Sequence, residues 1–400
     1  MTNAPFAGVR VLDQTQVLAG PFTGRLLGDL GADVIKIEQP PAGEPSRQFA
    51  PYFLGGESAY FLAFNSNKRG ITLNLQLAEG LEAFYKLVAI SDVVLENFRP
   101  SVPVRLKIDY DTLKAINPHL IYCAISGFGH GAPNQERAAM DTNIQALSGV
   151  MSIIGEEGQP PANMGFPVGD LAAAYAALAG ISAALFDRER TGKGRLVDIS
   201  LLDTMVSLQG YIGQFYLVSG KQPGRLGSGH PTNVPVGAFR TRDGIYLQIQ
   251  CVTQGLFRSL ATIIGEMVPG FHNLSTDARF ATPADRLNHR TELEAILKDA
   301  FATRTADEWM EKMADAIAIS RVNTIEQALQ EPSLIQRQMI VEIDHPKAGK
   351  FQTLGNPIKL GQDEVHRPPP LLGQHNEEIL GGLLGYTPGQ IEALRKRGAI

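Results

Sequence analysis

Cysteine and histidine are sparse in this 400-residue sequence. The two cysteines, Cys123 and Cys251, are far apart and form no C-x-x-C pair, so neither a disulfide framework nor a cysteine zinc site is supported. The eight histidines are scattered, and no two share a metal-ligand spacing on one element. We therefore expect no metal centre.

Strong charge is also lacking. The net charge is -5 with no run of like charges, which gives no basic field for nucleic acid. The N-terminal stretch "MTNAPFAGVRVLDQ" has neither a basic region nor an apolar core, and no segment approaches the apolar length that spans a bilayer. We expect a cytoplasmic protein that contacts neither nucleic acid nor membrane.

Several nucleotide-site and nucleophile motifs are absent. The loop after the first expected strand reads "QTQVLAG" (14–20) and lacks the G-x-G-x-x-G fingerprint, although Glu38 stands where a ribose-binding acid would be. This disfavours a nicotinamide oxidoreductase. Neither G-x-x-x-x-G-K-[ST] nor G-x-S-x-G occurs, so Ser126 is interpreted as a strand-end residue and not as a nucleophile.

The first half of the chain alternates short apolar strands with amphipathic helices. This pattern predicts an α/β fold with a parallel sheet that binds ligands outside the carboxyl ends of its strands. The expected strands are 9–13, 33–38, 70–75, 93–98 and 120–129, and the expected helices are 21–31, 77–90 and 110–117.

The second half predicts a further, smaller domain. Long helices are expected at 141–149, 170–190 and 200–219, followed by a Gly- and Pro-rich break at 220–235. A hairpin turning at Asp243-Gly244 and helices near 254–264, 291–302, 306–316 and 324–331 follow. We expect a large domain at 1–219, a small α+β domain at 225–335, and a linker at 336–400 that returns to the large domain.

Asp170 is the candidate reactive group. It lies in "NMGFPVGDLAAAYAALAG" (163–180), between a Gly- and Pro-rich approach and an Ala-rich helical run. Aspartate is a favoured helix N-cap, so one interpretation is purely structural. A carboxylate at a helix N-terminus also stays ionised, as a nucleophile requires, and Gly169 permits a close approach. Both interpretations are open on residue type alone.

An ordered set of segments carries a resemblance. They are "VLAGPFTGRLLGDLGADVIKIEQP", "NSNKRGITLNL", "VVLENFRP", "LIYCAISGFG", "VGD" before the Ala-rich helix, "RTGKGRLVDISLLD" and "PLLGQHNEEIL". In these segments the chain resembles the class III CoA-transferases, the family of formyl-CoA transferase and carnitine CoA-transferase. The resemblance implies a Rossmann-like large domain, a small domain and an interlocked homodimer.

The resemblance also implies a chemistry. The family's catalytic aspartate falls on Asp170, which would attack the acyl carbon of a CoA thioester and pass CoA to a carboxylic acid through covalent aspartyl intermediates. Coenzyme A is then a co-substrate, and no tightly bound cofactor is expected. The partners are an acyl-CoA, a carboxylic acid and a second copy of the chain.

Positions for CoA carry over residue by residue. Arg105 is the natural partner of a CoA phosphate, with a surface ion pair as the alternative. Gln39 and Gln76 stand where formyl-CoA transferases have basic residues, and Lys68, Arg69 or Arg137 are the candidates to substitute. The full set is Leu18, Ala19, Gln39, Leu73, Gln76, Asn97, Phe98, Arg105 and Arg137.

The family's glycine-rich lid resembles "GSGHP" (227–231), where Gly227, Gly229 and His230 would close over the aspartate and stabilise an oxyanion. A simple interdomain turn is the alternative. Arg225 and His230, in or beside this segment, make a dicarboxylate acceptor conceivable. Surface placement explains both residues equally well.

A racemase branch of the family carries His before the Asp of a segment like "MDTNIQALSG" (140–149), where this chain has Met140. The missing base favours a transferase over an acyl-CoA racemase or isomerase. A CoA-binding protein without catalysis, in which Asp170 only caps its helix, is the remaining alternative.

Overall fold

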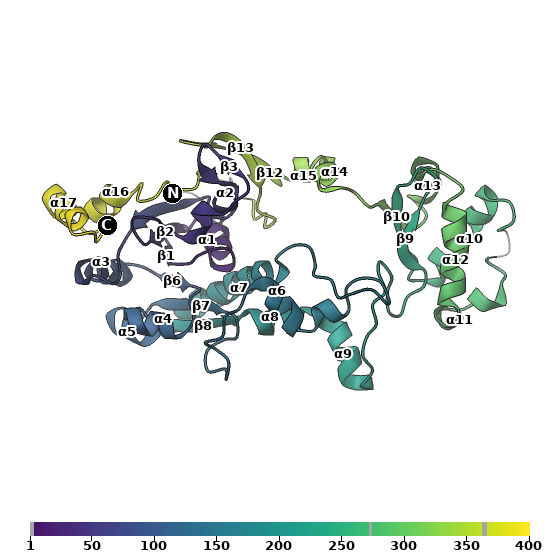
Figure 1. Cartoon of the computed structure of the whole chain (residues 1–400), viewed down its shortest axis with the longest axis horizontal. Helices are drawn as coiled ribbons and strands as arrows, with labels where there is room; N and C mark the ends of the chain where they lie inside the picture. Colours follow the sequence, from purple (N-terminus) through teal and green to yellow (C-terminus); the bar gives the residue numbers. More distant parts are fainter. Residues whose placement is uncertain (1–3, 272–273, 362–365) are drawn as a thin grey trace. The chain divides into compact units, whose positions relative to one another are not determined.

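The structure is a computed structural model that describes residues 4–271, 274–361 and 366–400 (Figure 1). It divides into two compact units. The first comprises Met1–Gly149, Met164–Gly210 and Pro332–Ile400, and the second comprises Val150–Asn163 and Tyr211–Glu331. Segments 150–163 and 211–219, expected in the large domain, therefore group with the second unit.

A six-stranded parallel sheet forms the centre of the first unit. Its order is β5-β2-β1-β6-β7-β8, so the strand order reverses at β1, between β2 and β6. Such a switch point is where open α/β sheets bind ligands. The α/β class and the parallel sheet are confirmed. The strands are β1 Arg10–Asp13, β2 Asp33–Glu38, β5 Lys68–Thr72, β6 Val93–Glu96, β7 Ile121–Ser126 and β8 Arg195–Ser200.

One side of this sheet is covered by helices from both ends of the chain. Leu87, Leu113, Ile379 and Leu394 are buried in one apolar cluster with sheet residues such as Leu12. The C-terminal return is visible in Figure 1, where the yellow helices α16 and α17 are the last elements of the chain. Leu87 lies on α3 (Ala78–Ala89), and Leu113 lies on α5 (Tyr110–Ile116). Ile379 lies on α16 (Asn376–Gly382), and Leu394 lies on α17 (Pro388–Lys396).

The helix α7 (Val168–Thr191) corrects an expectation. By length and composition it is apolar enough to cross a membrane, so the statement that no segment reaches that length is wrong. It packs against α1 (Ala19–Asp29), β7, β8 and α8 (Leu201–Leu208), and buries Ala173, Ala177 and Ile181. The core helix of a globular protein passes the same test of length and composition.

The remaining elements of the first unit connect these layers. They include a hairpin that the sequence did not lead us to expect, β12 Ile340–His345 with β13 Gly349–Leu354. The others are η1 Pro45–Gln48, β3 Phe53–Leu54, β4 Glu57–Ser58, α2 Ala59–Phe64, α4 Ser101–Leu106, α6 Asp141–Leu147 and α15 Pro332–Gln336.

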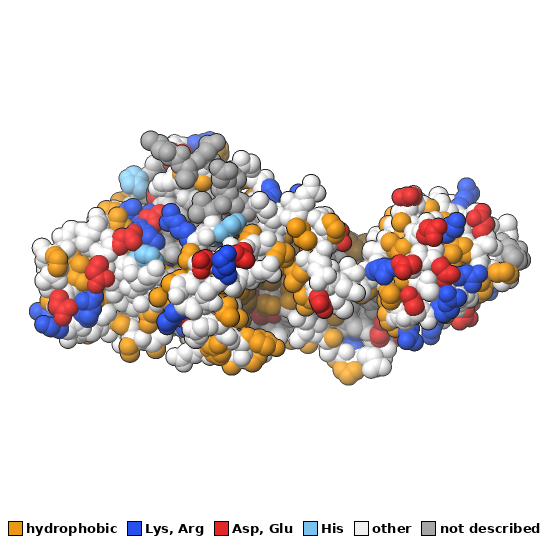
Figure 2. Space-filling model, turned by 90° about the horizontal axis from the view of Figure 1, so that it is seen from above, with side chains coloured by type: hydrophobic (Ala, Val, Ile, Leu, Met, Phe, Trp, Pro, Cys, Tyr) orange, Lys and Arg blue, Asp and Glu red, His pale blue; other side chains and the backbone are white. Residues whose placement is uncertain are grey.

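The second unit is an α+β structure around Trp309, Phe257 and Phe301, which are buried together. Its antiparallel sheet consists of β9 (Val236–Arg240), β10 (Tyr246–Gln250) and β11 (Ala318–Arg321) in the order β11-β10-β9, and the predicted turn at Asp243-Gly244 joins β9 to β10. The expected helix over 200–219 is broken into α8 and α9 (Gly210–Ser219) near Gly210, whose φ is +51°. On the face drawn in Figure 2, basic and acidic side chains are interspersed.

The elements of this unit are β9 Val236–Arg240, β10 Tyr246–Gln250, β11 Ala318–Arg321, η2 Val150–Ser152, η3 Ala278–Phe280, α10 Gln254–Met267, α11 Pro283–Asn288, α12 Arg290–Phe301, α13 Ala306–Met313 and α14 Ile325–Leu329; α9 spans Gly210–Ser219.

Candidate active site

Asp170 is the third residue of α7 and does not cap it. The N-cap position is Pro167, which has no side-chain hydrogen bond to the helix. The acceptor comes instead from α6, because Asp141 Oδ1 accepts hydrogen bonds from the backbone N–H groups of Gly169 (2.7 Å) and Asp170 (3.1 Å). The N-cap interpretation of Asp170 is therefore wrong.

Asp141 is fixed in this position by its own neighbours. Its second oxygen, Oδ2, accepts a hydrogen bond from Gln145 Nε2 at 2.6 Å. Gln145 also accepts from the backbone N–H of Met164 and donates to the carbonyl of Phe166. The first turn of α6 and the chain leading into α7 are thus tied together by side chains four residues apart on one helix face.

Gly169 is required by this arrangement. A Cβ atom added at Gly169 would lie 2.9 Å from Asp141 Oδ1 and 3.4 Å from Met205 Cγ. The acceptor oxygen can reach the helix terminus only because no side chain stands between them. Gly169 was expected to permit a close approach, and the group that approaches it is the carboxylate of Asp141.

The Asp170 carboxyl group has an unusual environment. Burial and then the charge of Asp141 raise its pKa to about 7. Within the described part of the chain it takes part in no hydrogen bond through its side chain. Burial and the charge of Asp141 therefore oppose the ionised form that we expected at the helix N-terminus.

Tyr60, on α2, is a neighbour of Asp170 that no sequence pattern predicted. Burial, and then the charges of Asp170, Glu44 and Asp141, raise the pKa of its phenol. The ring packs edge-on against Phe49 and Phe64 at centroid distances of 5.2 and 5.4 Å. Tyr60 thus remains protonated at physiological pH and keeps a hydroxyl donor in the neighbourhood of Asp170.

Along the chain, each predicted CoA position comes after the carboxyl end of a strand of the sheet. Leu18 and Ala19 follow β1 at the start of α1, where they are 2 % and 4 % exposed. Each of the other positions also follows the carboxyl end of a strand: Gln39 follows β2, Leu73 and Gln76 follow β5, Asn97, Phe98 and Arg105 follow β6, and Arg137 follows β7. Their contact with CoA stays a prediction.

The basic candidates differ in availability. Lys68 is buried, with Nζ 2.8 Å from Asp13 Oδ2, so it cannot replace a surface phosphate contact. Arg69 is paired with Asp33 and Glu378. Arg105 and Arg137 are exposed, and neither forms an ion pair with any residue in the described ranges. These two arginines retain free donors.

The predicted lid residues lie in the second unit. Gly227 has φ +55°, and an added Cβ would lie 2.2 Å from Glu156 Oε1. His230 Nε2 lies 3.0 Å from the Tyr211 hydroxyl, and its Nδ1 accepts hydrogen bonds from the backbone N–H groups of Thr232 and Asn233. The closure of this segment over Asp170 stays a prediction.

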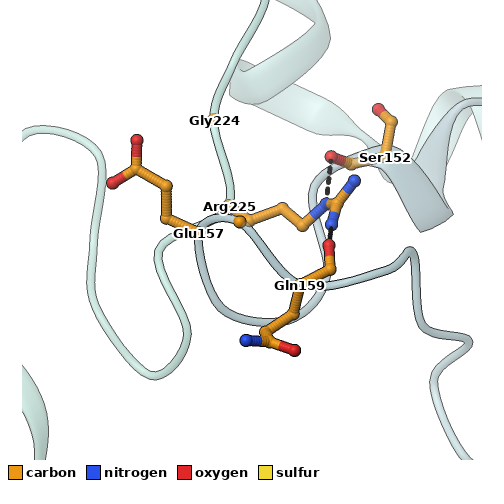
Figure 3. Close-up of a pocket in the computed structure, with 6 residues that line it drawn as sticks. Ser152, Glu157, Gln159, Gly224 and Arg225 are labelled. Carbon is orange, nitrogen blue, oxygen red and sulfur yellow. Dashed lines mark hydrogen bonds between the residues drawn. The ribbon is translucent and has the colours of Figure 1, made fainter.

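Arg225 lines a cavity of about 300 Å³ in the same unit. Its guanidinium donates to the carbonyl oxygens of Ser152 and Gln159, while the Glu157 carboxylate points away from it (Figure 3). Two N–H groups of Arg225 therefore bind the backbone of 150–163, which weakens the suggestion that this side chain binds a substrate carboxylate.

Across the described residues, no three His, Cys, Asp or Glu side chains are grouped to hold a metal ion.

Comparison with known proteins decides the family, since the model of CoA-transferase family III matches residues 6–376. The chain belongs to this family. It is 36 % identical over 399 residues to mouse (Mus musculus) succinyl-CoA:glutarate CoA-transferase, covering 99 % of this chain and 90 % of that protein. The acetyl-CoA:oxalate CoA-transferase of Acetobacter aceti is 36 % identical, covering 92 % of each.

The fold comparison agrees with the family. The crystal structure of a CAIB/BAIF family protein from Brucella suis has a TM-score of 0.83 and 35 % sequence identity, covering 95 % of this chain and 100 % of that one. Members of the CoA-transferase family are enzymes that transfer CoA from CoA thioesters. The chain is an enzyme of this class, and a CoA thioester is its co-substrate.

Proposed function

We propose that the protein moves CoA from an acyl-CoA to a carboxylic acid through covalent intermediates on Asp170. The observation that carries this proposal is that two neighbouring acids, Asp141 and Asp170, make different contacts. Asp141 binds the N-terminal amides of α7, which leaves the Asp170 carboxyl group without a structural hydrogen bond in the described residues. A desolvated carboxylate is the more reactive nucleophile.

The proposed reaction proceeds through an anhydride. Asp170 carboxylate attacks the thioester carbonyl carbon, the C–S bond breaks, and CoA thiolate leaves from an acyl-aspartyl anhydride. The thiolate then attacks the aspartyl carbonyl, which releases the donor acid and leaves an aspartyl-CoA thioester. No proton or ATP is consumed in these steps.

The second half repeats these steps with the acceptor. Its carboxylate attacks the aspartyl-CoA carbonyl and expels CoA thiolate, which gives a new anhydride. Attack of the thiolate on the acceptor's acyl carbon forms the product thioester and regenerates the Asp170 carboxylate. The proposed lid, Gly227–Pro231, would exclude water from the anhydrides.

The acceptor is proposed to be a short dicarboxylic acid. Two relatives that match almost the whole chain are named for transfer to glutarate and oxalate, which are both dicarboxylates. This support comes from the relatives and not from Arg225, which donates two of its N–H groups to backbone carbonyl oxygens. Met140 is 64 % exposed and brings no base, so the racemase alternative gains no support.

We also propose that the enzyme works as an interlocked homodimer in the cytoplasm. In the first unit, α7, β8 and α8 line an open groove of about 540 Å³ that includes Tyr175 and Leu208. Phe186, on the same helix as Tyr175, is 68 % exposed. Apolar surface of this kind is typical of an association face. Sedimentation of the wild type and of Phe186→Glu tests the dimer.

Thioester exchange with mass spectrometry tests the function. The purified enzyme receives succinyl-CoA or acetyl-CoA with pooled mono- and dicarboxylic acids, beside Asp170→Asn. A matched control is Asp111→Asn, which makes the same change in the exposed first turn of α5. New thioesters should form with the wild type and Asp111→Asn only. Hydroxylamine should trap the acyl-aspartyl species on the peptide that contains Asp170.

Two results would contradict the proposal. Exchange by Asp170→Asn at the wild-type rate would place the nucleophile elsewhere. Binding of free CoA without exchange of any pair would favour a CoA-binding protein without catalysis.

A further inference from the structure

The loop after β1 has a backbone that its own sequence does not favour. Val17 has φ +69°, a left-handed conformation that is an outlier for a β-branched residue. The loop lies at the point where the strand order reverses, next to Leu18 and Ala19. A strained residue persists only where its surroundings determine its conformation.

Four side chains hold the three residues of this loop. Asp13 Oδ1 accepts from the N–H of Thr15 at 2.9 Å, and Lys36 Nζ donates to the Thr15 carbonyl at 3.0 Å. Glu44 Oε2 accepts from the N–H of Val17 at 3.0 Å. Three of the holding groups are therefore charged, and all three side chains are buried.

The fourth side chain, Asn97, holds the middle of the loop. Its Oδ1 accepts from the N–H of Gln16 at 2.8 Å, and its Nδ2 donates to the carbonyl of the same residue at 2.8 Å. A primary amide can satisfy both backbone groups of one residue in this way, whereas a carboxylate or an alkyl group cannot. Asn97 thus fixes the peptide groups on both sides of Gln16, directly before Val17.

We infer that Asn97 is a positioning residue that keeps the 15–17 loop in its strained conformation, and that it acts on acyl-CoA through that loop. Both the oxygen and the nitrogen of its amide bind Gln16, so the structure gives the side chain a role in the loop in addition to the CoA contact expected from the family resemblance. Gly20 adds to the constraint, since a Cβ there would lie 2.2 Å from Thr15 Cγ2. The link to acyl-CoA rests on the proposed function, but the link to the loop does not.

Hydrogen exchange tests the link to the loop without any substrate. In Asn97→Ala, the amides of Gln16 and Val17 should exchange at least about tenfold faster than in the wild type. The matched control is Asn117→Ala. Asn117 donates to the carbonyls of Val88 and Ser91 and accepts from the N–H of His119, so it makes comparable bonds away from this loop. Unchanged exchange at Gln16 and Val17 would overturn the inference.

A double variant tests the link to acyl-CoA. Asn97→Ala should raise KM for acyl-CoA on the order of 10- to 100-fold, because misplacement of a binding loop by about 1 Å has effects of this size. Val17→Gly removes the cost of the left-handed backbone, so Val17→Gly with Asn97→Ala should recover most of this loss. A purely structural role of Asn97 would predict no rescue, and KM would then stay high.

The two proposals can fail separately. If the wild type bound free CoA in calorimetry but exchanged no thioester, the transferase proposal would fail, and the CoA dissociation constant would replace KM in the rescue test. Asn97→Asp should behave like Asn97→Ala, since it keeps the acceptor but sets a negative charge against the Gln16 carbonyl. Wild-type behaviour of Asn97→Asp would overturn the requirement for a donor.

Discussion

Asp141 Oδ1 lies 3.1 Å from the backbone nitrogen of Asp170 and accepts its hydrogen bond. One acid thus binds the terminus of the helix on which the other acid is presented. The same closeness raises the pKa of the Asp170 carboxyl group, after the larger effect of burial. Asp141 therefore both binds the N-terminus of α7 and raises the pKa of Asp170.

Removal of the charge on Asp141 should move the pH dependence of transfer. Asp170 must be ionised to attack, and its pKa of about 7 predicts that kcat/KM falls as the pH drops below 7. Asp141→Asn keeps an acceptor oxygen for the helix but removes the negative charge. The pKa of Asp170 should fall, and the acidic limb of the profile should move to lower pH.

Asp141→Ala separates the charge from the cap. It should shift the profile in the same direction and also lower the free energy of unfolding by about 1 kcal/mol, the typical cost of a lost N-cap acceptor. An acidic limb that stays near pH 7 in both variants would show that Asp141 does not tune Asp170.

Asp170→Asn should stabilise the protein at alkaline pH while it abolishes transfer. The pKa of Asp170 is raised from 3.8 to about 7, so the folded state holds a proton between these values that the unfolded chain releases. The wild type therefore loses stability as the pH rises across this window. In the wild type, the free energy of unfolding falls by about 1.4 kcal/mol for each pKa unit of the shift. The asparagine variant does not titrate and has no such loss.

Urea unfolding at several pH values measures this difference. The two proteins should match near pH 4, diverge up to pH 7 and stay apart by a few kcal/mol above it. A constant difference at all pH values would contradict the raised pKa.

Lys68→Met should destabilise the first unit strongly. Lys68 Nζ and Asp13 Oδ2 are 2.8 Å apart, and both side chains are fully buried. The substitution leaves the Asp13 charge buried without its partner, which costs about 3–5 kcal/mol. Chemical denaturation would show this, and Asp13→Asn combined with Lys68→Met should recover part of it.

Lys86→Met is the control for this experiment. Lys86 pairs with Glu82 on an exposed helix face, with side chains 47 % and 64 % exposed. Its loss should change the free energy of unfolding by less than about 1 kcal/mol. Equal effects of the two substitutions would contradict the importance of burial.

Arg105→Ala and Arg137→Ala should each raise KM for acyl-CoA about tenfold at unchanged kcat, the size of one charge-assisted hydrogen bond. Arg395→Ala, which breaks a surface contact to Glu377, is the control and should leave KM unchanged. With dephospho-CoA thioesters, the effect should vanish for whichever arginine binds the ribose phosphate. An unchanged KM for both variants would remove them from the CoA site.

The sequence by itself determined most strands and helices of the first unit and the place of Asp170 at the start of an Ala-rich helix. Apolar strands such as 33–38 and the amphipathic helices between them are local patterns, and an Ala-rich run after "VGD" is a helix wherever it packs. The hairpin at Asp243-Gly244 was predictable for the same reason, since its turn chemistry lies in adjacent residues.

The tertiary structure alone decided what surrounds that acid. Asp141 and Asp170 are 29 residues apart in the sequence, and Tyr60 is further from both. No local sequence pattern therefore predicts that these three side chains affect one another's pKa values. The pairing of Lys68 with Asp13, and of Asn97 with Gln16, likewise depends on which strands become neighbours in the sheet. Burial and long-range electrostatics set the pKa values, and hydrogen bonds from distant side chains hold the strained backbone at Val17, so both arise only when the chain has folded.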